Sequence, residues 1–177
     1  KPIKILMVWN GGMSFHGGVI GVIIAAYFFS KKHKINQFVF LDLVSLSAPI
    51  GIFFGRIANF INSELYGTST ELPWSVKFIS VDNINRHPSQ LYEAIFEGII
   101  LFFIMRYFFK KNYLNKPGQI SFLFLIFYSL FRFFTEFFRV PDPHIGYLIL
   151  NLTLGQLISV FFIIISSLLL SIKKNES

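Results

Sequence analysis

An unusual polar stretch follows the apolar run Phe38 to Phe54 and extends from Gly55 to Gly67. Its polar side chains include Arg56, Asn59, Asn62 and Glu64. An arginine at the edge of the hydrocarbon is costly unless it meets a counter-charge, a phosphate or a water-filled cavity. We therefore interpret this stretch as part of a functional site in which Arg56 binds an anion.

A second polar pattern lies further along the chain, where Tyr128, Arg132, Glu136 and Arg139 follow one stripe of a helix. One interpretation is an intrahelical Arg–Glu–Arg ladder that holds the end of a membrane helix. The other is an anion clamp in which the Glu136 carboxylate orients both arginines. We favour the clamp because guanidinium groups match phosphate oxygens in bidentate fashion and lysine does not.

Two histidines accompany these patterns. His16 lies between two pairs of glycines, which let a ligand approach the backbone and suit a general base or phosphate donor. A satisfied core histidine is the alternative. His87 precedes Pro88 and is expected to be a helix N-cap. Below it, Gln90, Glu93 and Glu97 share one helix face, and the depth of Glu97 demands a partner, either structural or Arg132.

The composition indicates a membrane protein. The 177 residues are 54% hydrophobic and only 14% charged, whereas soluble domains carry roughly 25% charged residues. The sequence has no cysteine, which excludes a disulfide framework, thiolate zinc and a cysteine nucleophile within the chain. We predict an all-α, polytopic helical membrane protein.

Five apolar runs approach the length that spans a bilayer. They are Phe15 to Ser30, Phe38 to Phe54, Leu91 to Phe109, Gln119 to Phe134 and Thr153 to Ile172. Lysines cluster in the 31–37 and 110–118 connections and after the fifth run, so these places are expected to be cytoplasmic. Residues 1–177 then form a single transmembrane domain with 62–90 as an outer, periplasmic loop. Because the basic charge mostly sets orientation, we expect no nucleic-acid partner.

The five alternating spans place every unusual polar cluster at the outer ends of the helices, which predicts one shared site. A metalloprotease is disfavoured because the chain has no HExxH-like spacing, and we expect no metal ligand. A transporter or channel would carry polar residues through the membrane depth. Here only Asp42, Glu97 and Gln156 lie deeper.

Four motifs resemble, in order, those of the prolipoprotein diacylglyceryl transferase family. They are the Gly-Gly-Met-Ser-Phe-His-Gly-Gly run from Gly11 to Gly18, the stretch from Gly55 to Gly67, the His87-Pro88-Ser89-Gln90-Leu91-Tyr92-Glu93 run, and the segment from Phe131 to Asp142. The resemblance implies a seven-span protein of the bacterial inner membrane with its active site toward the periplasm. Since five spans are counted here, we expect a C-terminal portion that lacks two N-terminal spans.

The resemblance also implies a reaction. The diacylglyceryl group of phosphatidylglycerol passes to the thiol of a lipobox cysteine in a prolipoprotein, which yields a thioether and releases glycerol phosphate, without a cofactor. Arg56 and Arg132 would hold the phosphate, and His16 or Glu136 would help to deprotonate the thiol. Supporting roles in lipid binding and site structure are expected for Asn59, Asn62, Glu64, Gly67, Tyr128, Arg139, His87, Gln90 and Glu93. The alternative is a lipid-binding or transport protein that uses the same clamp without chemistry.

Overall fold

The computed structural model describes the backbone of residues 15–141 and 146–175, and the side chains of residues 21–141 and 146–173. Helices form over all five apolar runs, which confirms the predicted all-α class. Their bounds are α1 Phe15–His33, α2 Gln37–Ile61, α3 Ser89–Glu93 continued by the π-helical η3 Ala94–Ile100 and by α4 Leu101–Lys110, α5 Gln119–Thr135, and α6 Leu154–Asn175. Short 3₁₀ turns are η4 Tyr113–Asn115, η5 Glu136–Phe138 and η6 Ile149–Asn151.

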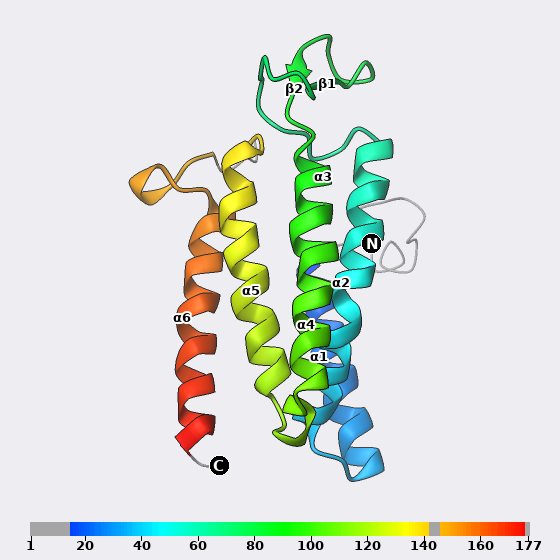
Figure 1. Cartoon of the computed structure of the whole chain (residues 1–177), viewed down its shortest axis with the longest axis vertical. Coiled ribbons are helices and arrows are strands. Elements are labelled where there is room, and N and C mark those ends of the chain that lie inside the picture. The colour runs from blue at the N-terminus through cyan, green and yellow to red at the C-terminus, as the bar shows by residue number, and fades with distance from the viewer. Residues whose placement is uncertain (1–14, 142–145, 176–177) are drawn as a thin grey trace, which may run out of the picture.

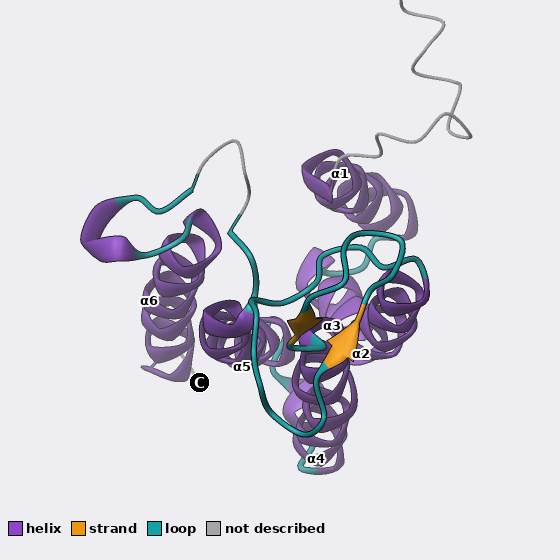
Figure 2. Cartoon of the chain, turned by 90° about the horizontal axis from the view of Figure 1, so that it is seen from above, coloured by secondary structure: helices purple, strands orange, loops and turns teal. Residues whose placement is uncertain are grey.

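The helices alternate in direction, as the lysine distribution predicts (Figure 1). The 31–37 and 110–118 connections lie at one end of the bundle together with the end of α6. The loop after α2 and the segment before α6 lie at the other end, called the outer end below. Seen along the bundle, α6, α5, the α3–η3–α4 helix and α2 form a row, and α1 packs beside α2 (Figure 2).

Three helices among the described residues are long and apolar enough to cross a membrane, namely Gln37–Ile61, Gln119–Phe138 and Leu154–Lys173. Their side chains are largely apolar on the outside of the bundle, which suits contact with lipid. Helix α2 extends to Ile61 rather than ending at Phe54. Arg56 and Asn59 therefore belong to its last two turns instead of a following loop.

The outer loop carries the only paired strands among the described residues, β1 Val76–Lys77 and the antiparallel β2 Asn85–Arg86. Arg86 donates to the Asp82 carboxylate, with its Nη2 2.6 Å from Oδ2, and stacks on the Tyr66 ring. The hairpin is thus held by local polar contacts.

The opposite end of the bundle is held by Asp42, one of the polar residues predicted to lie deep. Its fully buried carboxylate accepts hydrogen bonds from the Gly118 and Ser121 backbone amides, at 2.6 and 2.8 Å, and from the Ser121 hydroxyl. These amides belong to the start of α5, whose first N–H groups have no partner within the helix. Asp42 therefore satisfies the start of α5 from helix α2.

Candidate active site

The centre of the outer-end site is a pair of carboxylates on the middle helix, Glu93 and Glu97, both fully buried. They lie where α3 becomes the π-helical η3, and π-helical stretches frequently occur at functional sites. Gly98 allows this helix to approach α2 closely, since a Cβ there would lie 2.7 Å from the Cβ of Phe53. The predicted shared face is confirmed, because Gln90 on the same face is also fully buried.

Arg56 reaches these carboxylates from α2. Its Nε lies 3.0 Å from Glu93 Oε2 and its Nη2 lies 3.2 Å from Glu97 Oε2. The second contact is a hydrogen bond, whereas the first is an ion pair without hydrogen-bond alignment. The arginine thus finds the counter-charge that its position at the hydrocarbon edge requires.

Arg132 reaches the same pair from α5. Its Nη1 lies 2.5 Å from Glu93 Oε1 and 3.7 Å from Glu97 Oε1, while its Nη2 forms a close ion pair with Glu136 Oε2. The partner predicted for Glu97 is therefore Arg132, together with Arg56. The expected convergence of Arg56 and Arg132 on one anion is confirmed, and in this structure that anion is Glu93.

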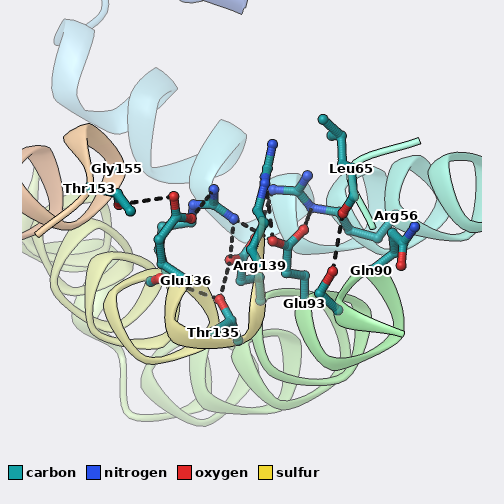
Figure 3. A network of polar contacts seen from close by, with 12 residues as sticks. Arg56, Leu65, Gln90, Glu93, Thr135, Glu136, Arg139, Thr153 and Gly155 are labelled. Carbon is teal, nitrogen blue, oxygen red and sulfur yellow. Dashed lines mark hydrogen bonds and ion pairs between the residues drawn. The ribbon is translucent and has the colours of Figure 1, made fainter. Parts of the chain in front are cut away.

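Arg139 corrects part of the predicted stripe. Helix α5 ends at Thr135 and a 3₁₀ turn follows, so Arg139 leaves the helical register. Its Nη1 lies 3.5 Å from Glu93 Oε1, and Figure 3 shows Arg56 and Arg139 both directed at Glu93. The expectation that Glu136 orients both arginines was wrong. Among the described contacts, Glu136 forms an ion pair with Arg132, whereas Arg139 forms its ion pair with Glu93.

Glu136 is 8% exposed and is held from a second helix. The Thr153 hydroxyl donates a hydrogen bond to Glu136 Oε1 at 3.0 Å (Figure 3). Both oxygens of this carboxylate are therefore engaged, one by a hydroxyl and one by a guanidinium. This arrangement favours an orienting role for Glu136 over that of a general base.

The outer loop crosses the top of the site at Gly67. Gly67 N donates to His87 O at 3.0 Å, and Gly67 also pairs with Arg139 in an isolated antiparallel bridge. A Cβ at Gly67 would lie 2.4 Å from His87 O and 2.6 Å from Phe138 O. Only glycine fits where these three backbone segments meet. Gly67 therefore fixes the position of the backbone at Arg139.

The two asparagines of the stretch from Gly55 to Gly67 have structural roles at the end of α2. Asn62 is the C-cap residue of α2, and Asn59 donates through Nδ2 to Glu64 Oε2 at 3.1 Å. The Glu64 backbone carbonyl accepts a 2.6 Å hydrogen bond from Gln90 Nε2. Gln90 thereby joins the end of α2 to the central helix.

His87 is not the N-cap residue that the sequence led us to expect, since Pro88 occupies the N-cap position of α3. Its Nδ1 lies 3.1 Å from the Tyr92 hydroxyl, which also accepts a 2.8 Å hydrogen bond from Trp74 Nε1. The ring contacts Phe138 edge-on, with 5.2 Å between ring centroids. Through these contacts His87 packs the outer loop against the segment that follows α5.

The remaining predicted residues are His16 and Tyr128. The backbone of His16 belongs to the first turn of α1, but its side chain lies outside the described part of the structure, as do Gly11 to Ser14. Tyr128 lies one turn before Arg132 on α5 and stacks on Phe124 with an interplanar angle of 11°. It thus forms the floor of the site toward the apolar core.

Sequence reasoning missed two hydroxyl residues. Thr135 Oγ1 donates to Glu97 Oε1 at 3.3 Å, and Thr153 binds Glu136. The signal for Thr153 was available, since Thr153 and Gln156 have the spacing of a helix capping box. Thr135 had no comparable signal, because a threonine at a helix end is ordinary.

The arrangement has the features of an anion-binding site. Three arginine side chains, 14 to 19% exposed, meet over buried carboxylates. Burial, and then the neighbouring Arg132 guanidinium, lower the pKa of Arg139 despite Glu93. Among the described contacts, Arg139 has one ion pair, whereas Arg56 has two and Arg132 has three, so the charge of Arg139 is the least compensated of the three. Such a guanidinium gains most from an added anion.

Comparisons with known proteins agree with the motifs. The family model described as prolipoprotein diacylglyceryl transferase matches residues 1–172. Relatives named phosphatidylglycerol–prolipoprotein diacylglyceryl transferase include one from Rickettsia bellii (strain OSU 85-389), 56% identical over 161 residues, covering 90% of this chain and 61% of the relative. A Rickettsia akari (strain Hartford) relative is 52% identical over 96% of this chain and 66% of its own length. A Wolbachia pipientis wMel relative is 50% identical over 95% of this chain and 65% of its own length.

The chain thus spans just under two thirds of the length of the curated relatives that it matches. The match includes the polar stretch from Gly55 to Gly67 and the residues that build the buried Arg–Glu cluster. Together with the apolar helices, it identifies a multi-pass membrane protein. The chain belongs to the prolipoprotein diacylglyceryl transferase family.

Proposed function

We propose that the protein transfers the diacylglyceryl group of phosphatidylglycerol to the thiol of a lipobox cysteine in a prolipoprotein. The sulfur forms a bond to the glyceryl carbon that carries the phosphate, and that carbon's bond to the phosphate oxygen breaks. The products are a thioether and glycerol phosphate, and the thiol proton passes to a base. The leaving phosphate changes from a diester anion to a monoester with additional negative charge.

The observation that carries this proposal is the convergence of Arg56 and Arg132 on Glu93. Their nitrogens lie 3.0 and 2.5 Å from the two oxygens of one carboxylate. Two guanidinium groups that meet at one carboxylate are spaced to meet at one phosphate, whose oxygens have similar geometry. They would stabilise charge that develops on the leaving phosphate.

A buried acceptor in the cluster further suits a headgroup that bears hydroxyls. Gln90 Oε1 has no hydrogen-bond donor among the described residues, whereas Glu93 Oε2 and Glu136 Oε2 are held by arginines in ion pairs. Buried acceptors without donors are uncommon in folded proteins. The glycerol headgroup of phosphatidylglycerol carries two hydroxyl groups, either of which could donate to this oxygen.

The remaining roles follow from position. Because both Glu136 oxygens are engaged, we assign the thiol deprotonation to His16 and the orientation of Arg132 to Glu136. Arg139 adds a third guanidinium at the rim of the site. Asn59, Asn62, Glu64 and Gly67 shape the outer end of α2 and the loop above it, and Tyr128 closes the floor.

We place the protein in the bacterial inner membrane with the outer end of the bundle toward the periplasm. The lysine-rich 110–118 connection supports this orientation. Exposed positions at the two ends provide the test, Asn112 in that connection and Ser80 in the outer loop. A cysteine at position 80 should react with an impermeant thiol reagent added to intact spheroplasts, and one at 112 only after lysis. The reverse pattern would contradict the orientation.

The activity is tested with purified protein in vesicles of phosphatidylglycerol and a peptide that contains a lipobox cysteine. We expect release of glycerol phosphate and a matching mass increase of the peptide. A peptide with serine in place of cysteine and vesicles of phosphatidylethanolamine serve as controls. Binding of the lipid without thiol-dependent release would instead indicate the non-catalytic lipid-binding function.

A further inference from the structure

The first turn of α6 begins with a complete capping box. The backbone N–H of Gln156 donates to Thr153 Oγ1 at 3.2 Å, and the backbone N–H of Thr153 donates to Gln156 Oε1 at 3.0 Å. Both side chains are buried, at 5% and 2% exposure. Two N–H groups that the helix itself cannot satisfy are thereby satisfied reciprocally.

The Thr153 hydroxyl also forms a hydrogen bond outside helix α6. A hydroxyl carries one proton and two lone pairs, so it can accept from Gln156 and still donate once. That proton is directed at Glu136 Oε1, 3.0 Å away. Figure 3 shows Thr153 and Glu136 side by side, with Gly155 beside them. The cap and the carboxylate of the site therefore share one oxygen atom.

Gly155 provides the room for this contact. A Cβ there would lie 3.0 Å from Glu136 Oε1 and 3.1 Å from Glu136 Cδ, tighter than ordinary van der Waals contact. The Glu136 carboxylate thus packs directly against the start of α6, where the helix dipole favours negative charge. The other carboxylate oxygen meets Arg132.

We propose that Thr153 and Gly155 are positioning residues of the transferase site. They hold the Glu136 carboxylate in one orientation, and Glu136 in turn fixes Nη2 of Arg132 while its Nη1 meets Glu93. Helix α6 would thus act on the anion clamp without touching substrate. This inference rests on the proposed function for its kinetic consequence only, since the contact itself is testable without activity.

The kinetic test compares Thr153→Ser, which keeps the hydroxyl, with Thr153→Val, which keeps the shape but loses it. We expect Thr153→Val to lower kcat about tenfold, as for one lost charge-assisted hydrogen bond, with KM for the peptide nearly unchanged. Thr153→Ser should restore most of the rate. Gly155→Ala should also lower kcat, because its Cβ displaces Glu136.

A matched control separates positioning from helix capping. Asn36→Ala removes the side-chain cap of α2 at the opposite end of the bundle, where Asn36 Oδ1 accepts from Phe38 N at 2.9 Å. It should lower the melting temperature by a few degrees, as loss of a cap does, and leave kcat unchanged. A Thr153→Val protein with kcat within twofold of wild type would overturn the inference.

A double-mutant cycle tests the contact without catalysis. If the hydroxyl holds the carboxylate, Thr153→Val should lower the melting temperature less in a Glu136→Gln background than in wild type. Additive shifts would overturn the inference even if the wild-type protein released no glycerol phosphate. If the wild-type protein released no glycerol phosphate but the two substitutions were non-additive, the proposed function would be contradicted and the contact between Thr153 and Glu136 would be supported.

Discussion

The lysine substitution at Arg132 distinguishes charge from shape in the proposed clamp. Arg132 uses two nitrogens for two carboxylates on different elements, Nη1 for Glu93 Oε1 at 2.5 Å and Nη2 for Glu136 Oε2. A lysine places a single ammonium nitrogen on a flexible stem, so it keeps the charge and loses the fork. If the residue only extended its charge to the membrane interface, lysine would serve nearly as well.

The magnitude follows from the contacts. Arg132→Lys removes at least one charge-assisted contact, and a hydrogen bond of that kind contributes about 1.5–3 kcal/mol. If the loss is felt in the transition state, turnover falls roughly 10- to 150-fold, since each 1.36 kcal/mol corresponds to tenfold. Glu136 would also lose its ion pair while buried, which adds a separate cost in stability.

The assay is the initial rate of glycerol phosphate release from phosphatidylglycerol vesicles in the presence of the lipobox peptide. Arg106→Lys is the matched control, because Arg106 is an exposed arginine on α4, away from the Arg–Glu cluster. It should retain the wild-type rate at the same protein level. An Arg132→Lys protein within about twofold of wild type would refute the clamp role for Arg132 and leave Arg56 to hold the anion.

Three further predictions concern stability. Gly67→Ala forces a Cβ to within 2.4 Å of His87 O and should destabilise the fold by about 1–3 kcal/mol in thermal unfolding, whereas Gly51→Ala, with open space around it, should not. Asp42→Asn removes charge-assisted bonds to the start of α5 and should cost about 1–3 kcal/mol; an unchanged melting temperature would contradict this role. The hydrogen bond from Arg86 lowers the pKa of Asp82. The pair therefore stabilises the 76–86 hairpin fully at pH values above the ordinary aspartate pKa of about 4. This stabilisation is lost as the pH falls through the lowered pKa. The protection factors of the hairpin amides, which are corrected for the pH dependence of intrinsic exchange, should therefore stay constant from pH 7 to 5 and fall only in more acidic solution; a fall near pH 6 would point to another group.

The sequence predicted those features that depend on local pattern. Apolar runs located the helices, and lysines gave their directions, because both signals are read from neighbouring residues. The meeting of Arg56 and Arg132 was also predictable, since two arginines at the same end of a helix bundle both need a counter-charge or an anion.

Contacts that depend on helix rotation could not be predicted in the same way. Which anion the arginines share depends on how the central helix turns, and the π-helical stretch after Glu93 changes that rotation. The end of α5 shows the same limit. Side chains at helical spacing share one face only while the helix continues. The 3₁₀ turn after Thr135 interrupts that spacing, so Arg139 contacts Glu93 rather than Glu136.

The buried carboxylates explain how such a site can exist in a membrane protein before substrate arrives. Isolated guanidinium groups at this depth would be costly, and Glu93, Glu97 and Glu136 offset that cost. The same carboxylates fix the guanidinium groups in place, so little reorganisation is needed when an anion enters. Because Glu93 is the common partner of all three arginines, a phosphate that binds them must either share their donors with Glu93 or displace it.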